Sequence, residues 1–327
     1  MKIFFITGHR KSGTSLLNKL FDNHEELNVY PTDISILYAF FPQFSERYNK
    51  NTKKYNQRLK RVIYKTLLES GISFGSHSNS SKYGKIIYNH MKKIPVEDRN
   101  NPRKLVDRLC KGFLEAKRKH GEAIQKTTLL KETSILSFSP SLLKKNSKVV
   151  VLIRDPRDNF AAINAGVKKY YSKFGEDELS ALASTINRIK FDLSLAAYYR
   201  KIKDKRFLFI KFEHLVTEPK KIVKKICKFC GISFNNNLLI PTVGGKQAIG
   251  NNFDGKRFSG ISQSHIGQYK KRVPTLYIKI IEWFLEKEMK QWGYVRKNFY
   301  LGHKYLKAIE IFYKEYNSKY FFKDSFK

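Results

Sequence analysis

The sequence predicts an α/β fold in which a short central parallel sheet is flanked by helices, giving three layers. Segments with helical spacing of apolar residues separate the apolar runs, which favours right-handed crossovers between parallel strands. A helical region closes the chain. We expect one domain over residues 1–293 and a helical, basic and aromatic extension over residues 294–327. The runs expected to be strands are residues 2–7, 27–30, 149–153 and 206–212.

The composition indicates a folded protein with an unusual charge. The chain has 327 residues, of which 41% are hydrophobic, and this is enough for a sizeable core. Its 64 Lys and Arg residues against 28 Asp and Glu residues give a net charge of +36. That charge attracts polyanions such as nucleic acid, acidic lipid, acidic polysaccharide or a nucleotide. AT-rich coding drift, with Lys, Asn, Ile, Phe and Tyr all abundant, explains the charge equally well.

Compartment and cysteine usage restrict the class of protein further. No apolar run is long enough to span a membrane, and the first apolar residues are too few for a signal peptide, so we expect a cytoplasmic protein. Three cysteines do not make a disulfide framework. Cys227 and Cys230 lack the second pair that a zinc site needs, and we expect them to be structural. Residues 241–272 are glycine-rich and basic, and we expect a loop there.

A glycine-containing loop follows the first predicted strand. Residues 8–15 read Gly-His-Arg-Lys-Ser-Gly-Thr-Ser, and Thr14 stands where the Walker A pattern requires a lysine. The backbone N–H groups of such a loop can still bind a phosphate, and Ser12, Thr14 and Ser15 add hydroxyl donors. No convincing Walker B carboxylate follows a later strand. The loop therefore suits one anionic group near a 5′ position better than a triphosphate.

A second phosphate contact is predicted where the strand at residues 149–153 ends. Arg154 follows this strand, at the edge where ligands bind in parallel sheets. A guanidinium at that place can bind a phosphate bidentately. The alternative is an ion pair of Arg154 with Asp155 or Asp158. Two separated phosphate contacts imply a nucleotide that carries phosphate at two places.

These motifs together resemble the sulfotransferases that use 3′-phosphoadenosine 5′-phosphosulfate, and the resemblance covers most of the chain. Residues 11–15 resemble the family's 5′-phosphosulfate loop, and residues 154–158 resemble its 3′-phosphate motif. Residues 212–219 and 229–231 resemble two later segments. The pattern is nearest to the carbohydrate-modifying, tyrosylprotein-modifying and bacterial members. The resemblance implies a P-loop-like fold and the donor 3′-phosphoadenosine 5′-phosphosulfate, with 3′-phosphoadenosine 5′-phosphate as product.

The resemblance also implies which residues bind the donor. Lys11 would contact the bridging oxygen of the donor and stabilise its leaving charge. Because a sulfuryl group carries less charge than a phosphoryl group, no metal is required. Ala162 stands where the family has a serine on the 3′-phosphate, so either Asn159 or Asn164 substitutes or the affinity for this phosphate is reduced. The full set of expected donor-binding residues is Arg10, Lys11, Ser12, Gly13, Thr14, Ser15, Arg154, Asn159, Lys256 and Arg257.

A carboxylate is expected to take the proton of the acceptor. Asp33 stands at a spacing comparable to that of a glutamate in the carbohydrate-modifying and tyrosylprotein-modifying members, and we expect it to be the general base. The alternative role of Asp33 is a helix N-cap before residues 34–37. His24, His77 and Glu132 are reserve candidates. Lys131 resembles a second active-site lysine of the carbohydrate-modifying branch.

The predicted function is therefore sulfuryl transfer to a hydroxyl or amine acceptor. A carbohydrate is the expected acceptor, because of the Asp33 spacing and the positive charge, and no specific nucleic acid is expected as a partner. A catalytically inactive binder of acidic glycan or nucleic acid is the first alternative, supported by Ala162 and by the degraded segment at Lys131. A small-molecule kinase is the second, and it would need a metal-binding carboxylate. Neither acceptor identity nor oligomeric state follows from the sequence.

Overall fold

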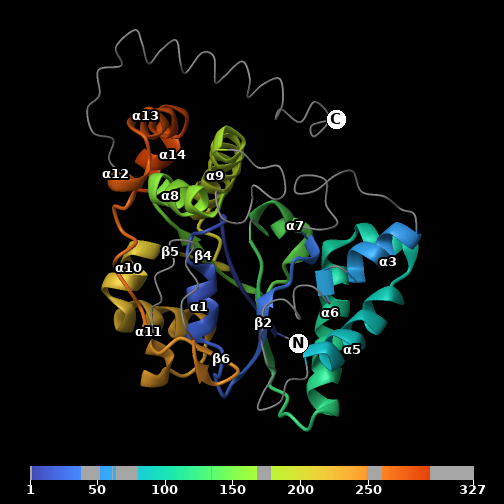
Figure 1. Ribbon diagram of the computed structural model, residues 1–327. Helices are drawn as coiled ribbons and strands as arrows, with labels where there is room; N and C mark the ends of the chain where they lie inside the picture. Colours follow the sequence, from blue (N-terminus) through green and yellow to red (C-terminus); the bar gives the residue numbers. More distant parts are fainter. Residues whose placement is uncertain are drawn as a thin grey trace.

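The protein is built around a parallel sheet of five strands in the order β2-β3-β1-β4-β5, seen in the computed structural model of Figure 1. The structure describes residues 2–37, 52–60, 62–63, 80–133, 135–167, 178–248 and 260–294. The strands of the sheet are β1 (Lys2–Gly8), β2 (Leu27–Asp33), β3 (Thr127–Lys131), β4 (Lys148–Ile153) and β5 (Phe207–Lys211).

The central strands are apolar on both faces because helices cover both sides of the sheet. Phe5 of β1 pairs with Leu130 of β3 on one side and with Val149 of β4 on the other. Successive side chains of a strand point to opposite faces. Phe5 accordingly belongs to one apolar core and its neighbour Phe4 to the other. This explains the continuous apolar runs that predicted these strands.

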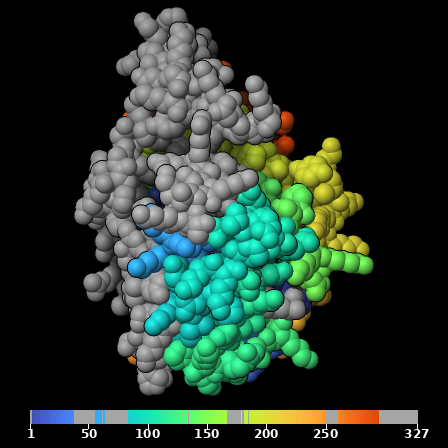
Figure 2. Space-filling model, turned by 90° about the vertical axis from the view of Figure 1, so that its right-hand side faces the viewer, coloured from blue at the N-terminus to red at the C-terminus, as the bar shows by residue number. Residues whose placement is uncertain are grey.

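Two helical layers enclose the sheet. The core on the Phe4 face is completed by α1 (Thr14–Leu20), α10 (Phe212–Thr217) and α11 (Pro219–Cys230). The larger core on the Phe5 face is shared by α3, α5, α6, α7, α8, α9, α13 and α14. These elements are α3 (Thr52–Lys60), α5 (Ser80–Lys92), α6 (Pro102–Lys119), α7 (Ser139–Leu142), α8 (Pro156–Val167), α9 (Glu178–Lys201), α13 (Thr275–Phe284) and α14 (Glu286–Gln291). Figure 2 views the side on which α5 and α6 form the surface.

The predicted fold class is confirmed, and the four predicted strands correspond to β1, β2, β4 and β5. β3 was not predicted from the sequence. The prediction of a loop over residues 241–272 is wrong at three places in the described part of this range, where short regular elements form. There the chain forms a hairpin of β6 (Thr242–Val243) and β7 (Lys246–Gln247), and the helix α12 (Tyr269–Arg272). Gly244 and Gly245, both with positive φ, make the hairpin turn possible.

The predicted extension over residues 294–327 lies outside the described residues except for its first residue. It therefore stays a prediction, as does the boundary at residue 293. Among the helices that the structure describes, none combines the length and the apolar character needed to cross a membrane.

Candidate active site

The loop between β1 and α1 is a tight turn that depends on Gly13. This glycine has φ +99°, and a Cβ atom built on it would lie 2.4 Å from the ring of Phe212. The aromatic ring at the start of α10 therefore packs directly on the loop backbone. Lys11 also lies in the left-handed region, with φ 65°, although it is not a glycine. Such a conformation costs about 1–2 kcal/mol and must be held by its surroundings.

Positive charge is concentrated around Lys11. Burial is the main cause that lowers the pKa of Lys11, from 10.5 to about 7, and the charges of Arg10, Arg154 and Lys131 lower it further. Asp33 acts in the opposite direction. Charges of one sign crowded at a partly buried site attract an ion of the other sign. The loop is therefore an anion-binding region on electrostatic grounds as well as on its sequence pattern.

Arg154, predicted to bind phosphate, joins the loop to a distant segment. Its Nη1 donates to the carbonyl oxygen of Lys11 at 2.7 Å, and its Nη2 donates to the carbonyl oxygen of His265 at 3.0 Å. These backbone contacts take the place of the alternative ion pair with Asp155 or Asp158. The Nε of Arg154 is buried and has no hydrogen-bond partner among the described residues. Arg154 thus holds backbone through both of its terminal nitrogens and keeps the buried Nε–H for a ligand.

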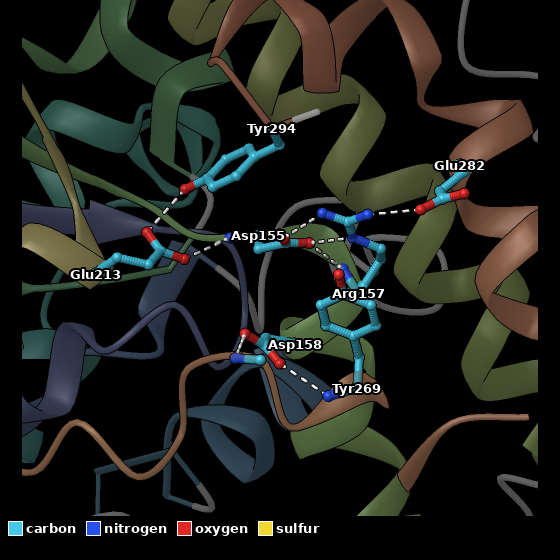
Figure 3. A network of polar contacts seen from close by, with 8 residues as sticks. Asp155, Arg157, Asp158, Glu213, Tyr269, Glu282 and Tyr294 are labelled. Carbon is cyan, nitrogen blue, oxygen red and sulfur yellow. Dashed lines mark hydrogen bonds and ion pairs between the residues drawn. The ribbon is translucent and has the colours of Figure 1, made fainter. Parts of the chain in front are cut away.

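The residues that follow Arg154 form a polar network with the end of the described chain (Figure 3). Asp155 accepts from Nε and Nη2 of Arg157 at 3.0 and 2.7 Å, and Nη1 of Arg157 donates to Glu282 of α13 at 2.5 Å. The backbone N–H of Asp155 donates to Glu213, which also accepts from the hydroxyl of Tyr294 at 2.9 Å. The motif predicted to bind the 3′-phosphate therefore attaches residues 282–294 to the sheet edge.

The predicted catalytic residues Asp33 and Lys131 lie together. They are the last residues of the neighbouring strands β2 and β3 and lie opposite each other after a shift in register between Val29 and Asp33. Nζ of Lys131 forms an ion pair with Oδ2 of Asp33 and donates to the hydroxyl of Ser15 at 3.2 Å. The Lys131 side chain is 4% exposed, whereas that of Asp33 is 33% exposed. The Asp33 side chain is therefore partly exposed, but its Oδ1 is buried and has no hydrogen-bond partner among the described residues. Lys131 connects the carboxylate to the loop.

The reserve candidates for the base differ in their positions. Glu132 is buried next to Lys131, and its pKa is raised, mainly by burial and then by Asp33. His24 is buried away from this cluster. Its Nδ1 accepts from the N–H of Glu26 at 3.1 Å, and its Nε2 lies 2.8 Å from the carbonyl oxygen of Ser233. Both ring nitrogens are thus used within the fold. His77 lies outside the described residues.

Other predicted donor contacts are partly accounted for. The side-chain amide of Asn159 donates to the carbonyl oxygen of Arg10, while that of Asn164 donates to Glu178. Asn159 is therefore at the loop. The side chain of Asn164 instead contacts Glu178, the first residue of α9. Lys256 and Arg257 lie outside the described residues.

His9 is a loop residue that sequence reasoning missed. It is 1% exposed, and neither ring nitrogen has a hydrogen-bond partner in the described part of the chain. Burial, followed by the charge of Arg154, lowers its pKa to about 3, so it is neutral. The Oγ of Ser12 and the Oδ1 of Asn159 are likewise buried without partners there. In the sequence, only the position of His9 inside the glycine loop indicated that it belongs to the site. Unsatisfied polar atoms gathered at one loop fit a polar ligand.

The cysteine pair has a structural environment. Cys227 and Cys230 are buried in α11, and burial raises the pKa of Cys227 to about 11. Such thiols are poor nucleophiles at neutral pH. Over the ranges that the structure describes, no group of three or more His, Cys, Asp or Glu side chains is arranged to hold a metal ion.

Comparison with known proteins gives one family. Residues 4–236 match the model of the sulfotransferase family. The sulfotransferase domain of the Synechococcus PCC 7002 olefin synthase is similar over 91% of this chain and 96% of its own, with a TM-score of 0.55 and 16% identity. The sulfotransferase domain from the curacin biosynthetic pathway is similar over 90% and 99%, with a TM-score of 0.50 and 17% identity. At these identities the two structures support the fold. No curated protein matches the sequence.

Proposed function

Because this chain belongs to the sulfotransferase family, we propose that it moves a sulfuryl group from 3′-phosphoadenosine 5′-phosphosulfate to a hydroxyl or amine of a carbohydrate. The observation that carries the proposal is the meeting of Lys11, Lys131 and Asp33 where the parallel strands end. A cationic loop on one side and a carboxylate with one unpaired oxygen on the other suit a displacement between an anionic leaving group and a neutral nucleophile.

The donor half of the reaction belongs to the loop. Lys11 stabilises the negative charge that develops on the bridging oxygen as the sulfur–oxygen bond breaks. The buried hydroxyl of Ser12 and the Nε of Arg154 are donors without partners in the described chain, which fits the phosphates of the donor. Sulfuryl transfer resembles phosphoryl transfer in that positioning and electrostatic stabilisation supply most of the rate. We infer that these residues act by charge and position.

The acceptor half of the reaction belongs to Asp33. The acceptor oxygen or nitrogen attacks the sulfur, the bisphosphate leaves with the bonding electron pair, and the acceptor proton moves to the carboxylate of Asp33. The ion pair with Lys131 orients this carboxylate. Lys131 also reaches Ser15 of the loop, so one buried ammonium ties the base to the donor side. Glu132, the residue after Lys131, is buried and has no assigned role in the transfer.

An anionic carbohydrate is favoured as acceptor by the surface of α11. Glu115 pairs with Lys119 on α6, and Glu218, directly before α11, pairs with Lys221. The helix α11 contains no acidic residue, and like charges three or four residues apart destabilise a helix. Its solvent face therefore attracts a linear polyanion. The exposed lysines of this face are Lys220, Lys221, Lys224, Lys225 and Lys228.

Thermal unfolding with added nucleotide tests the proposal. A ligand that binds only the folded chain adds about 2.7 kcal/mol of stability at a hundred times its Kd. We expect 3′-phosphoadenosine 5′-phosphate to raise the melting temperature and Mg-ATP to leave it unchanged. Lys11→Ala should remove the rise, and Lys201→Ala, at an exposed lysine of α9, should keep it.

Three results would contradict the proposed function. A rise with Mg-ATP alone would indicate a kinase. Binding of the bisphosphate without turnover of the phosphosulfate on any hydroxyl or amine acceptor would indicate an inactive binder. Turnover of small phenols with inert glycans would refute the carbohydrate acceptor.

A further inference from the structure

Both carboxylate oxygens of Asp158 hold one turn of the backbone. Asp158 lies in the first turn of α8, and its Oδ2 accepts from the N–H of Gly267 at 2.6 Å. Its Oδ1 accepts from the N–H of Tyr269 at 2.9 Å. In the view of Figure 3, Asp158 lies below Asp155, and its carboxylate points toward the backbone nitrogen of Tyr269. Hydrogen bonds to a carboxylate are among the strongest in proteins, so Asp158 holds the backbone of this turn. The guanidinium of Arg157 also lies over the ring of Tyr269, 4.5 Å from its centroid.

The same turn presents a carbonyl group to Arg154. The carbonyl oxygen of His265 accepts from Nη2 of Arg154, and the carbonyl oxygen of Lys11 accepts from Nη1. One planar guanidinium therefore spans the turn and the donor loop. The guanidinium group is planar and rigid, so a shift of the His265 carbonyl oxygen that turns Nη2 also reorients Nη1, which donates to Lys11. The position of the turn is thereby transmitted to the backbone of the lysine that we propose to be catalytic.

Lys11 needs such a contact because of its backbone conformation. Its φ of 65° lies in the left-handed region that residues other than glycine rarely adopt. The hydrogen bond from Arg154 to its carbonyl oxygen is 2.7 Å long. The N–H of Ser12 donates to the carbonyl oxygen of His9 at 3.1 Å and closes the other side of the turn. A strained residue at a reacting position persists only where its surroundings hold it.

We propose that Asp158 is a positioning residue for the donor site, acting on Lys11 through the turn at residues 265–269 and through Arg154. This inference rests on the proposed function of the loop. Arg157 and Glu213 attach Glu282 and Tyr294 separately from Asp158. Weakening Asp158 therefore removes the hydrogen bonds that hold the backbone of the turn and leaves the contacts of Glu282 and Tyr294 in place.

Asp158→Asn is the test, because asparagine keeps the size but offers one acceptor oxygen for two N–H donors. We expect the Kd for 3′-phosphoadenosine 5′-phosphate, measured by titration calorimetry, to rise about tenfold, equivalent to about 1.4 kcal/mol. We expect the KM for the donor to rise and kcat to fall, with the KM for the acceptor unchanged. Asp204→Asn is the matched control, since Asp204 accepts from the N–H and guanidinium of Arg206 before β5.

A second pair of variants avoids loss of the aspartate. Gly267 has φ +71°, and Gly121, after α6, has φ +73°; a Cβ atom added at either glycine would meet open space. An alanine therefore strains both turns equally. Gly267→Ala should weaken bisphosphate binding in the same direction as Asp158→Asn. Gly121→Ala should lower stability to a similar extent and leave the Kd unchanged.

The outcomes separate the inference from the proposed function. If the unaltered protein binds the bisphosphate and both Asp158→Asn and Gly267→Ala bind it with the same Kd, the positioning role is wrong and the proposed function stands. If Asp204→Asn weakens binding as much as Asp158→Asn, the effect is general destabilisation and the inference also fails. If the unaltered protein does not bind the bisphosphate, the proposed function fails and the inference fails with it.

Discussion

The charge on Lys11 should make the stability of this protein depend on pH in a way that Lys11→Met removes. Burial, then Arg10, Arg154 and Lys131, lowers the pKa of Lys11 from 10.5 to about 7 in the folded chain. Unfolding separates the ammonium from these charges and restores its ordinary pKa. Between about pH 7 and pH 10.5 the unfolded chain therefore binds more protons at this residue than the folded chain. The free energy of unfolding rises with pH over this window.

The size of the effect follows from the same change in pKa. One proton bound only in the unfolded state changes the free energy of unfolding by about 1.4 kcal/mol per pH unit. Methionine is unbranched like lysine but carries no charge. We therefore expect Lys11→Met to be more stable than the unaltered protein at about pH 7.5. At about pH 9.5 this advantage should be smaller by about 2.5 kcal/mol.

Urea denaturation of the two proteins at both pH values is the assay. Other groups also titrate over this interval, but they are shared, so the difference between the two proteins isolates Lys11. Lys201→Met, at an exposed lysine of α9, should differ from the unaltered protein by the same amount at both pH values. If the difference for Lys11→Met were also the same at both pH values, burial and the neighbouring positive charges would not lower this pKa, and the electrostatic argument would be wrong.

Three further changes test other parts of the site. Asp33→Asn should lower kcat by about 10²- to 10⁴-fold in steady-state assays and keep the Kd for the bisphosphate; an unchanged kcat would exclude Asp33 as the base. Gly13→Ala should cost about 2–5 kcal/mol in urea denaturation, because the new methyl group meets the ring of Phe212 in a left-handed backbone; a loss below about 1 kcal/mol would contradict this packing. Lys220→Gln combined with Lys228→Gln should weaken binding of an acidic polysaccharide most at low salt; equal binding in a filter assay would remove α11 as the acceptor surface.

The fold could be predicted from the sequence because its central strands are continuous apolar runs. β3 was missed for a physical reason. It is only five residues long, begins with two threonines and ends with Lys131, so neither apolar character nor alternation marks it. It is a strand because it pairs with β1 on one side and with β2 on the other. That pairing is a tertiary effect, which local propensity does not contain.

Missing β3 also limited the prediction of the site. Asp33 and Lys131 were each predicted as catalytic from the family pattern, but their contact depends on the register of β2 with β3. The ends of neighbouring parallel strands meet at one edge of a sheet. Even with β3 assigned, their ion pair would not have followed from residue spacing, because the register of β2 with β3 shifts between Val29 and Asp33. Their catalytic roles remain predictions.

The contacts that the segment after β4 makes with distant residues could not have been predicted from the sequence. Asp158 and Gly267 are 109 residues apart, and Arg157 and Glu282 are 125 residues apart. A motif expected to bind phosphate turns out to use its Asp and second Arg side chains to hold the chain's own backbone and carboxylates. Only Arg154 of this motif keeps a buried donor without a partner in the described residues.

The buried cations and the ligand that they imply are energetically connected. The charges of Arg10, Arg154 and Lys131 disfavour the protonated form of Lys11 in the folded chain, and Asp33 is the carboxylate that opposes them there. A folded protein that keeps such an arrangement is less stable than its core would permit, and an anion bound at the loop relieves the repulsion. Binding of the donor and protonation of Lys11 should therefore favour each other. The repulsion that lowers the stability of the folded chain therefore raises its affinity for the phosphates of an anionic donor.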